Sequence, residues 1–301
     1  MIVLTADTGG GDVAVAAACM QCCHNKTVNL RKYEAFIDQA AKYGVRLLIF
    51  PEVSVQGYLT QRGDAKSPEV MAQLEYYREE AEPVPGPTTE RIGQLAAEYN
   101  MTIQIGMAER NEVGTVLYNS AVVVGPEGVI GVYRKVHNYT EIPIFRPGNR
   151  FSVFDTPIGR IGPFICADLN FPECLRALAI QGASILTMTT AWPMESDDSE
   201  RDYLGHIYEV QLEAAAVANQ VWIIAANQVM RPPTEGAANY YGHSRVVSPF
   251  GSVVAGCGYE ENLVLARVGI VDEIKRNKRS RGDRIQQRQP SLYSILSDER
   301  Y

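Results

Sequence analysis

The stretch Gly162–Gly182, GPFICADLNFPECLRALAIQG, joins a strand-like run to a helix-like run through one cysteine. With Ile158–Ile165 leading in, apolar residues and glycines alternate up to Cys166, as in a buried strand. Pro172 and the acidic residue after it are typical of a first helical turn, and apolar residues then recur at helical spacing up to the final glycine. The pattern predicts a tight strand-to-helix turn that carries Cys166.

A cysteine on such a turn exposes its sulfur and meets backbone N–H groups, and thiolates are favoured near helix N-termini. Either Asn170 or Phe171 can cap the helix that follows. The alternative is that Cys166 is a small buried core residue, the usual role of a single cysteine. Two other stretches of the chain favour the catalytic interpretation.

Length and composition are typical of a soluble globular enzyme. The 301 residues suffice for one large α/β domain or two smaller ones, and we find no Ser- or Gly-rich linker. The net charge of −7 gives no electrostatic support for nucleic-acid binding. No apolar run is long enough to span a membrane, and the apolar run at 13–20 is short and has no preceding Lys or Arg, unlike a signal peptide. We therefore predict a cytoplasmic, reduced protein without nucleic-acid or membrane partners.

Periodicity predicts helices and strands along the whole chain, after an N-terminal extension at 1–12 whose glycines lack the Gly-Lys-Ser/Thr of a phosphate loop. Helices are expected at 29–42, 67–82, 88–99, 171–182, 202–219 and 272–278. Strands are expected at 13–20, 45–50, 102–109, 116–124, 129–133, 151–154, 158–165, 184–189, 221–226, 243–248, 252–255 and 263–268. In the helix at 202–219 the buried face is expected to run through Leu204, Ile207, Tyr208, Leu212 and Ala215.

Two charged residues each follow a strand-like run. Glu52 ends the apolar segment Val45–Phe50, where a carboxylate must be paired or its pKa rises. Lys135 follows the run at 129–133. The alternatives are a surface or helix-capping role for Glu52 and a solvated edge position for Lys135.

A metal site is not supported by the spacing of the thiols and imidazoles. The segment Cys19–His24 holds three cysteines and a histidine, but a structural zinc site usually needs a second ligand pair, and none follows. His137 and Glu141 could form a pair, but the other histidines are scattered. We therefore predict neither a metal nor a cofactor.

Three segments line up in order along the chain: LLIFPE ends in Glu52, YRKVHN contains Lys135, and ICADLNFPE contains Cys166. Their order and approximate spacing resemble the nitrilase superfamily, the carbon–nitrogen hydrolases with a Glu-Lys-Cys triad. The supporting matches are Leu117–Ala121, Gly242–Arg245 with Pro249–Gly251, and Arg288–Tyr293. The resemblance covers about residues 13–295 in one register.

The resemblance implies a single-domain α/β fold, an αββα sandwich of the nitrilase type. It places a carbon–nitrogen hydrolase domain at 13–285 and a tail at 286–301 that forms an interface. It also implies a homodimer or higher homo-oligomer, with residues 171–182 and 199–219 as the candidate interface. The basic stretch 275–288 is either a solvated surface or an interface arm.

The resemblance also implies roles for individual residues. Cys166 would attack the amide carbonyl, and Glu52 would take the thiol proton and pass it to the departing amine. Lys135 and the backbone N–H of Ala167 would stabilise the oxyanion. Glu141 matches the family's second glutamate, which orients the lysine and the substrate.

The resemblance implies the substrate of the enzyme less precisely than its mechanism. Ala167-Asp168 after the cysteine is closer to the amidase and carbamoylase branches than to true nitrilases, which usually carry Trp-Glu there. Residues 169–171 lack the arginines with which D-specific carbamoyl-amino-acid hydrolases hold a carboxylate. Tyr58, Asn170 and Trp192 are candidate substrate-pocket residues, and each could equally be packing.

The sequence therefore predicts a thiol hydrolase that cleaves the C–N bond of a small amide or N-carbamoyl compound through a cysteine thioester and releases ammonia. The alternatives are nitrile hydrolysis by the same triad, acyl transfer to an amine, and an inactive scaffolding protein.

Overall fold

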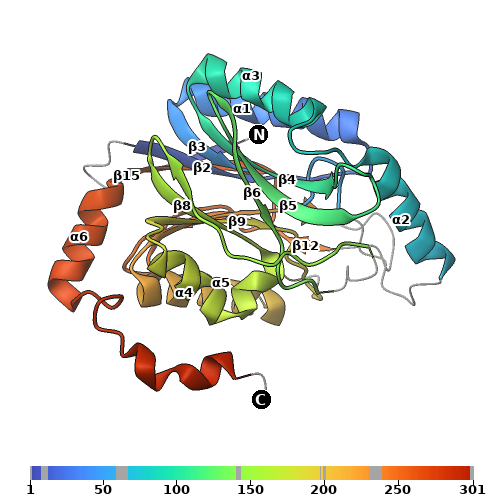
Figure 1. The fold of residues 1–301 in the computed structure, drawn as a ribbon. Helices are drawn as coiled ribbons and strands as arrows, with labels where there is room; N and C mark the ends of the chain where they lie inside the picture. The colour runs from blue at the N-terminus through green and yellow to red at the C-terminus, as the bar shows by residue number, and fades with distance from the viewer. Residues whose placement is uncertain are drawn as a thin grey trace.

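Two β-sheets pack face to face in the computed structural model, and helices cover both outer faces (Figure 1). The structure describes residues 2–7, 13–58, 67–139, 144–196, 198, 201–230 and 239–298. This four-layer arrangement is the αββα sandwich that the sequence predicts.

The first sheet of the described chain has seven strands in the order β1-β15-β2-β3-β4-β5-β6. Strands β2, β3 and β4 are parallel neighbours, and β4, β5 and β6 form an antiparallel meander. The strands are β1 (Ile2–Asp7), β2 (Val13–Cys19), β3 (Val45–Ile49), β4 (Thr102–Arg110), β5 (Leu117–Gly125), β6 (Gly128–Arg134) and β15 (Asn262–Val268).

The second sheet has six strands within the described ranges, in the order β14-β13-β10-β9-β8-β7. Strands β8, β9 and β10 are parallel, so their carboxyl ends meet at one edge. The strands are β7 (Phe154–Thr156), β8 (Gly159–Ile165), β9 (Ile185–Thr190), β10 (Trp222–Asn227), β13 (Arg245–Val247) and β14 (Val253–Gly256). The short strands β11 (Val229–Met230) and β12 (Tyr240–Tyr241) pair with each other.

The inner faces of the two sheets form the central core. Leu47 and Ile49 of β3 pack in one buried cluster with Trp222 and Ile224 of β10. Neighbouring residues of the same strands face outward and meet the helices, as Leu48 does. Because both faces of these strands are covered, they do not alternate between apolar and polar residues, and in β3 only Arg46 interrupts the apolar run.

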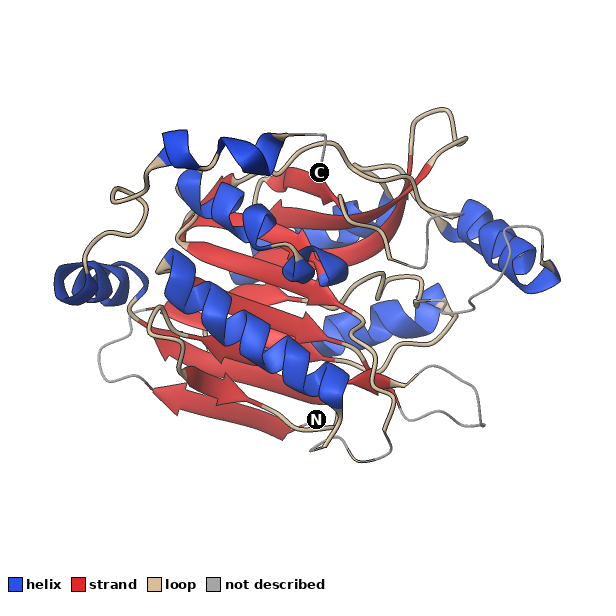
Figure 2. Ribbon diagram, turned by 90° about the horizontal axis from the view of Figure 1, so that it is seen from below, coloured by secondary structure: helices blue, strands red, loops and turns tan. Residues whose placement is uncertain are grey.

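Helices form the outer layers. Tyr33 of α1 (Lys26–Lys42) and Leu95 of α3 (Pro87–Tyr99) belong to the core cluster on the outer face of the first sheet. Leu178 of α4 (Pro172–Ile180) and Leu212 of α5 (Tyr203–Asn219) pack on the outer face of the second sheet. Figure 2 shows the second layer from below, with its helices lying across the strands. Helix α2 is Pro68–Glu80, and α6 is Ile270–Arg281.

Most predicted elements are confirmed within a few residues, and three predictions were wrong in detail. The strand expected at 151–154 begins only at Phe154, because β7 is a short hairpin arm paired with Gly159–Ile161. The helix expected at 272–278 corresponds to α6, which is longer at both ends. In α5, Ile207 is exposed, and Tyr208, Leu212 and Ala216 are buried with Gly205 and Asn219.

The N-terminal segment joins the sandwich, whereas the C-terminal segment lies outside it. Residues 2–7 of the predicted N-terminal extension form β1, which pairs in parallel with β15 at the edge of the first sheet. After α6, the short 3-10 helices η2 (Pro290–Leu292) and η3 (Ser294–Ser297) lie away from the core, near the end labelled C (Figure 1). In the described ranges we find no helix long and apolar enough to cross a membrane.

Candidate active site

Glu52 lies just beyond the carboxyl end of β3, where the chain crosses closely over β4. A Cβ atom on Gly106 would lie 2.1 Å from the carbonyl oxygen of Pro51 and 2.8 Å from the Cα atom of Glu52. Any other residue at Gly106 would therefore push this turn away. Val53 has a φ of 45°, the left-handed region that a β-branched residue rarely adopts. The surrounding structure thus fixes the position of Glu52 tightly.

The carboxylate of Glu52 is fully buried, and three of its hydrogen-bond donors lie in the described part of the chain. Its Oε1 accepts from Nζ of Lys135 at 2.7 Å and from Nδ2 of Asn119 at 2.7 Å. Its Oε2 accepts from the backbone N–H of Ala191 at 2.9 Å. A buried charge is stable only when it is paired and hydrogen-bonded. The surface and helix-capping alternatives for Glu52 are therefore wrong.

Lys135 brings the matching positive charge. Its side chain is 1% exposed, and its backbone N–H donates to the carbonyl of Asn119 at 2.8 Å. The solvated-edge alternative for Lys135 is therefore also wrong. Asn119 is not among the predicted site residues, although it lies in one of the segments that carry the resemblance; the available signal was the polar pair Asn119-Ser120 just before an apolar run.

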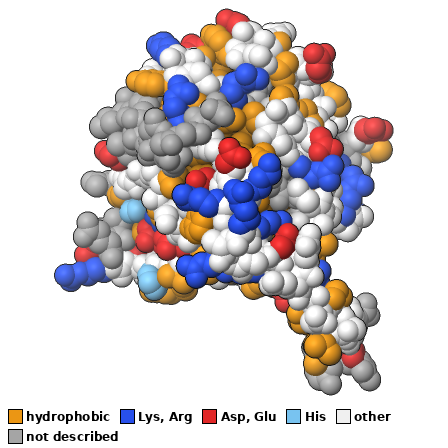
Figure 3. Space-filling view, turned by 90° about the vertical axis from the view of Figure 1, so that its left-hand side faces the viewer, with side chains coloured by type: hydrophobic (Ala, Val, Ile, Leu, Met, Phe, Trp, Pro, Cys, Tyr) orange, Lys and Arg blue, Asp and Glu red, His pale blue; other side chains and the backbone are white. Residues whose placement is uncertain are grey.

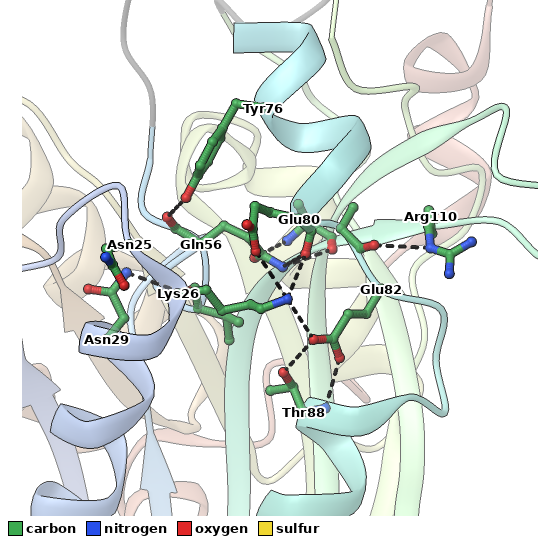
Figure 4. A network of polar contacts seen from close by, with 12 residues as sticks. Asn25, Lys26, Asn29, Gln56, Tyr76, Glu80, Glu82, Thr88 and Arg110 are labelled. Carbon is green, nitrogen blue, oxygen red and sulfur yellow. Dashed lines mark hydrogen bonds and ion pairs between the residues drawn. The ribbon is translucent and has the colours of Figure 1, made fainter.

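Helix α2 holds the segment that follows Glu52 (Figure 4). Tyr76 donates its hydroxyl to the carbonyl of Gln56 at 2.6 Å, and the Gln56 side chain bonds the backbone of Glu80 and Ala108. At the end of α2, Lys26 lies between the carboxylates of Glu80 and Glu82, at 3.1 Å from each. This network braces the turn of Glu52 from outside.

Cys166 follows the carboxyl end of β8 in the second sheet, and Glu52 follows the carboxyl end of β3 in the first sheet. Ile165, the last residue of β8, pairs with Thr189 of β9, and Ala191, two residues further on, is the N–H donor to Glu52. Cys166 has a φ of 46° and is partly exposed. The tertiary structure therefore places the cysteine at the end of the sandwich where the Glu52–Lys135 pair is buried.

The predicted direct turn from strand to helix needs correction. Cys166 begins a 3-10 helix, η1 (Cys166–Asn170), and α4 follows with Phe171 as its N-cap and Pro172 as its first residue. The first backbone N–H groups of any such helix lack intrahelical partners. The prediction that the cysteine lies on the turn between a strand and a helix is right, but Cys166 is itself the first residue of the short helix η1.

Asp168 is a buried residue of η1 whose structural role the sequence analysis missed. Its carboxylate is 0% exposed and accepts hydrogen bonds from the Tyr133 hydroxyl, from the backbone N–H of Ile165, and from the backbone and ring of His137. The available signal was an acidic residue inside an otherwise apolar turn.

The remaining predicted site residues have different surroundings. Ala167 is buried and Asn170 is exposed. Trp192 is buried and donates its ring N–H to the carbonyl of Leu204 at 2.8 Å. Tyr58 is 8% exposed and packs edge-to-face on Tyr240. Glu141 lies outside the described residues.

None of the six cysteines, all of which lie in the described ranges, forms a disulfide. Burial raises the pKa of the thiols of Cys19, Cys22 and Cys174 well above the usual value, so these three stay protonated at neutral pH. Among the described residues, no three His, Cys, Asp or Glu side chains are grouped as metal ligands would be.

Known proteins resemble this chain over nearly its whole length. The family model described as carbon-nitrogen hydrolase matches residues 13–273. An N-carbamoylputrescine amidase of Solanum lycopersicum is 32% identical over 94% of each chain, and the omega-amidase NIT2-B of Xenopus laevis is 30% identical over 90% of this chain and 92% of its own. The crystal structure of a carbon-nitrogen hydrolase from Helicobacter pylori superposes with a TM-score of 0.80 at 24% identity, over 95% of this chain and 99% of that one. The resemblance seen in the three sequence segments is thereby confirmed, and this chain belongs to the carbon–nitrogen hydrolase family of the nitrilase superfamily.

Proposed function

We propose that the protein hydrolyses the C–N bond of a small amide or N-carbamoyl compound through a thioester on Cys166 and releases ammonia. The observation that carries the proposal is the fully buried Glu52–Lys135 pair, 2.7 Å apart, at the end of the sandwich where Cys166 begins η1. A buried acid–base pair beside a partly exposed thiol is what amide cleavage by a cysteine requires.

In the first half of the reaction, the sulfur of Cys166 attacks the substrate carbonyl carbon while its proton moves to Glu52. The oxyanion that forms accepts hydrogen bonds from Nζ of Lys135 and the backbone N–H of Ala167. The C–N bond then breaks, the leaving nitrogen takes the proton from Glu52, and ammonia departs. In the second half, Glu52 takes a proton from water, and the hydroxide attacks the thioester. The C–S bond breaks, and the sulfur regains the proton.

Other residues have proposed supporting roles. Asn119 and the N–H of Ala191 hold the Glu52 carboxylate, so one oxygen stays bound when the other exchanges a proton. Glu141 is proposed as the second carboxylate on the resemblance alone. Tyr58 belongs to an apolar cluster with Val53, which follows Glu52, and Ala191, whose backbone N–H donates to Glu52, and this favours a neutral acyl group. Trp192 and Asn170 remain candidates for contacts further along the substrate.

A substrate panel tests the proposal. We expect ammonia release from at least one of a set of neutral, cationic and anionic amides and N-carbamoyl compounds, with an acyl adduct on Cys166 detected by intact mass spectrometry. The relatives named as N-carbamoylputrescine amidase and omega-amidase make cationic carbamoyl compounds and ω-amides the first choices. Nitriles and an added acceptor amine complete the panel.

Each outcome of the panel decides between classes of function. An adduct that decays in plain buffer supports hydrolysis. An adduct that decays only with an acceptor amine would assign acyl transfer, and turnover of nitriles alone would assign a nitrilase. No adduct and no ammonia with any compound would contradict the proposal and favour an inactive scaffold.

We also propose that the protein is a homodimer or larger homo-oligomer that buries the outer face of α4 and α5 and the C-terminal tail. The exposed apolar side chains on and beside these helices are Phe171, Ile180, Tyr203, Ile207 and Val210, each between 37% and 56% exposed. In the tail, Leu292, Ile295 and Leu296 are at least 60% exposed. Figure 3 shows apolar side chains on the projecting tail and Lys and Arg side chains gathered on the adjoining face. Exposed apolar surface of this extent marks an interaction site.

Size measurement by light scattering tests the assembly. We expect wild-type protein to be at least dimeric at micromolar concentration, and Val210→Glu to lower the mass to that of a monomer because a charge would be buried in the interface. Val113→Glu is the control, since Val113 is 79% exposed on the turn between β4 and β5, away from these helices. A monomeric wild-type protein, or a Val210→Glu protein of unchanged mass, would contradict the proposed surface.

A further inference from the structure

One buried carboxylate connects the two segments that carry the proposed catalytic groups. Asp168 lies two residues after Cys166, and its donors Tyr133 and His137 flank Lys135 at two residues on either side. We infer that Asp168 and His137 are positioning residues, which set the turn of Cys166 against the segment of Lys135. This inference rests on the function proposed above.

The Cys166 turn needs such support. Its φ of 46° is unfavourable for any residue with a Cβ atom and persists only where the surroundings impose it. Oδ2 of Asp168 accepts the backbone N–H of Ile165 at 2.9 Å, which closes η1 back onto the end of β8. The side chain of Asp168 therefore holds the backbone on both sides of the cysteine.

The other hydrogen bonds of Asp168 reach the opposite sheet. The Tyr133 hydroxyl of β6 donates to Oδ2 at 2.7 Å, and His137 donates to Oδ1 from its backbone N–H at 3.0 Å and from Nδ1 at 2.7 Å. Lys135 lies between these two donors and is itself anchored to Asn119 of the first sheet. Asp168 thus links the thiol-bearing turn of the second sheet to the lysine-bearing segment of the first.

The chemistry of this link requires a carboxylate. The four groups that the described structure hydrogen-bonds to Asp168 are all donors: two backbone N–H groups, the ring of His137 and the Tyr133 hydroxyl. Burial raises the pKa of Tyr133 far above its usual range and so keeps this hydroxyl protonated. The hydrogen bond places the ring proton of His137 on Nδ1. An amide at position 168 would turn its NH₂ group toward two of these donors and leave them unsatisfied.

His137 also contacts the helix that follows the cysteine. Its ring stacks on Phe171, the N-cap of α4, with the ring centroids 3.7 Å apart and the planes at 10°. Its side chain is 26% exposed, so the ring covers the link on its solvent side. The donor Nδ1 and the stacked ring are two separable features of this one residue.

Two substitutions of His137 separate these features. His137→Phe keeps a ring that can stack on Phe171 and removes the donor to Asp168. His137→Asn loses the ring and places an amide N–H near the position of Nδ1. We expect His137→Phe to lower kcat about 10- to 100-fold with KM changed less than about threefold, and His137→Asn to recover most of kcat. Asp168→Asn should lower kcat at least as much as His137→Phe.

His243 provides a matched control. Its Nδ1 bonds the carbonyl of Tyr241 at 2.7 Å, and its ring stacks on Tyr241 with centroids 3.9 Å apart. His243→Phe therefore repeats the same chemical change away from the proposed link, and kcat should stay within about threefold of wild type.

A second readout separates positioning from general loss of stability. The rate of alkylation of Cys166 by iodoacetamide, followed against pH by peptide mapping, should shift to higher pH in His137→Phe, because the thiolate would lie further from Lys135. Alkylation of the exposed Cys23 should not change. Melting temperatures are measured on the same samples.

The inference is overturned if His137→Phe has wild-type kcat, or if the Phe and Asn variants lose activity equally with an unchanged alkylation profile. Should His137→Phe not fold, His137→Gln replaces it. The amide nitrogen of glutamine lies one bond further from the backbone than Nδ1, so it does not occupy the position of the donor to Asp168, and kcat should fall as expected for His137→Phe. Loss of the proposed function is recognised separately: a Cys166→Ala protein that still releases ammonia would refute the mechanism itself.

Discussion

Replacing Cys166 with alanine is expected to abolish ammonia release, to less than about one part in 10⁴ of the wild-type rate. The reason is that the variant has no nucleophile, and loss of the nucleophile of a catalytic triad costs about 10⁶ in kcat in a serine hydrolase. The fold should persist, because Cys166 is partly exposed and a methyl group fills most of the space of the thiol. The measurement is ammonia release with the best substrate of the panel, together with circular dichroism.

Cys166→Ser should be nearly as inactive as the alanine variant. A hydroxyl needs a stronger base than a carboxylate to become a nucleophile, whereas a thiol does not. Cys23→Ala is the control, because Cys23 is an exposed thiol in the loop between β2 and α1, and this variant should keep wild-type activity. Substantial turnover by Cys166→Ala would exclude the thioester and with it the proposed mechanism.

Replacing Lys135 with methionine should lower kcat by about 10²–10³ or more and change KM far less. Methionine retains much of the apolar stem but removes the cation that the oxyanion needs in the transition state. Lys135→Arg should fail as well, because a planar guanidinium does not occupy the space of a compact ammonium in a fully buried site. Steady-state kinetics and alkylation of Cys166 at neutral pH, which should slow in Lys135→Met, are the measurements.

The stability of the Lys135 variants needs its own control. Breaking a buried ion pair by removing one partner costs about 3–5 kcal/mol, since the carboxylate of Glu52 is left uncompensated. Adding Glu52→Gln to Lys135→Met removes both charges, so the double variant should regain melting temperature but no activity.

Lys26→Met tests the same change at an ion pair outside the site. Lys26 lies 3.1 Å from both Glu80 and Glu82, and its side chain is about a quarter exposed (Figure 4). Its loss should therefore lower the free energy of unfolding only slightly and leave kcat near wild type. Near wild-type kcat in Lys135→Met would remove Lys135 from the mechanism.

Much of the fold could be predicted because its signals are local. The strand at 221–226 is a continuous apolar run, and the strand at 45–50 is interrupted only by Arg46, because both of their faces are covered; that pattern is visible in the sequence alone. The start of α4 is equally local, since Pro172 suits the first helical position and the acidic residue after it favours the positive end of the helix. Where a prediction was wrong, a tertiary contact decided: β7 begins at Phe154 because only residues 154–156 pair with β8.

The face that a helix buries is a less local property. The spacing in α5 allowed Ile207 on the buried side, but the helix is rotated so that Gly205 lies against the ring of Tyr241, and Ile207 is exposed. The periodicity fixes the existence of an apolar stripe, whereas the packing of α5 on the second sheet selects which residues lie beneath it.

The sequence by itself determined the kinds of chemical group available and the strand or turn on which each lies: an acid after β3, a lysine after β6, and a cysteine before a helix start. Only the tertiary structure decided that the acid and the lysine, 83 residues apart, share one hydrogen bond of 2.7 Å, and that Asp168 links the cysteine turn to the lysine segment. The physical reason is that burying a charge is unfavourable until a specific partner compensates it, and chain order carries no information about which distant partner the packed sheets will bring within reach.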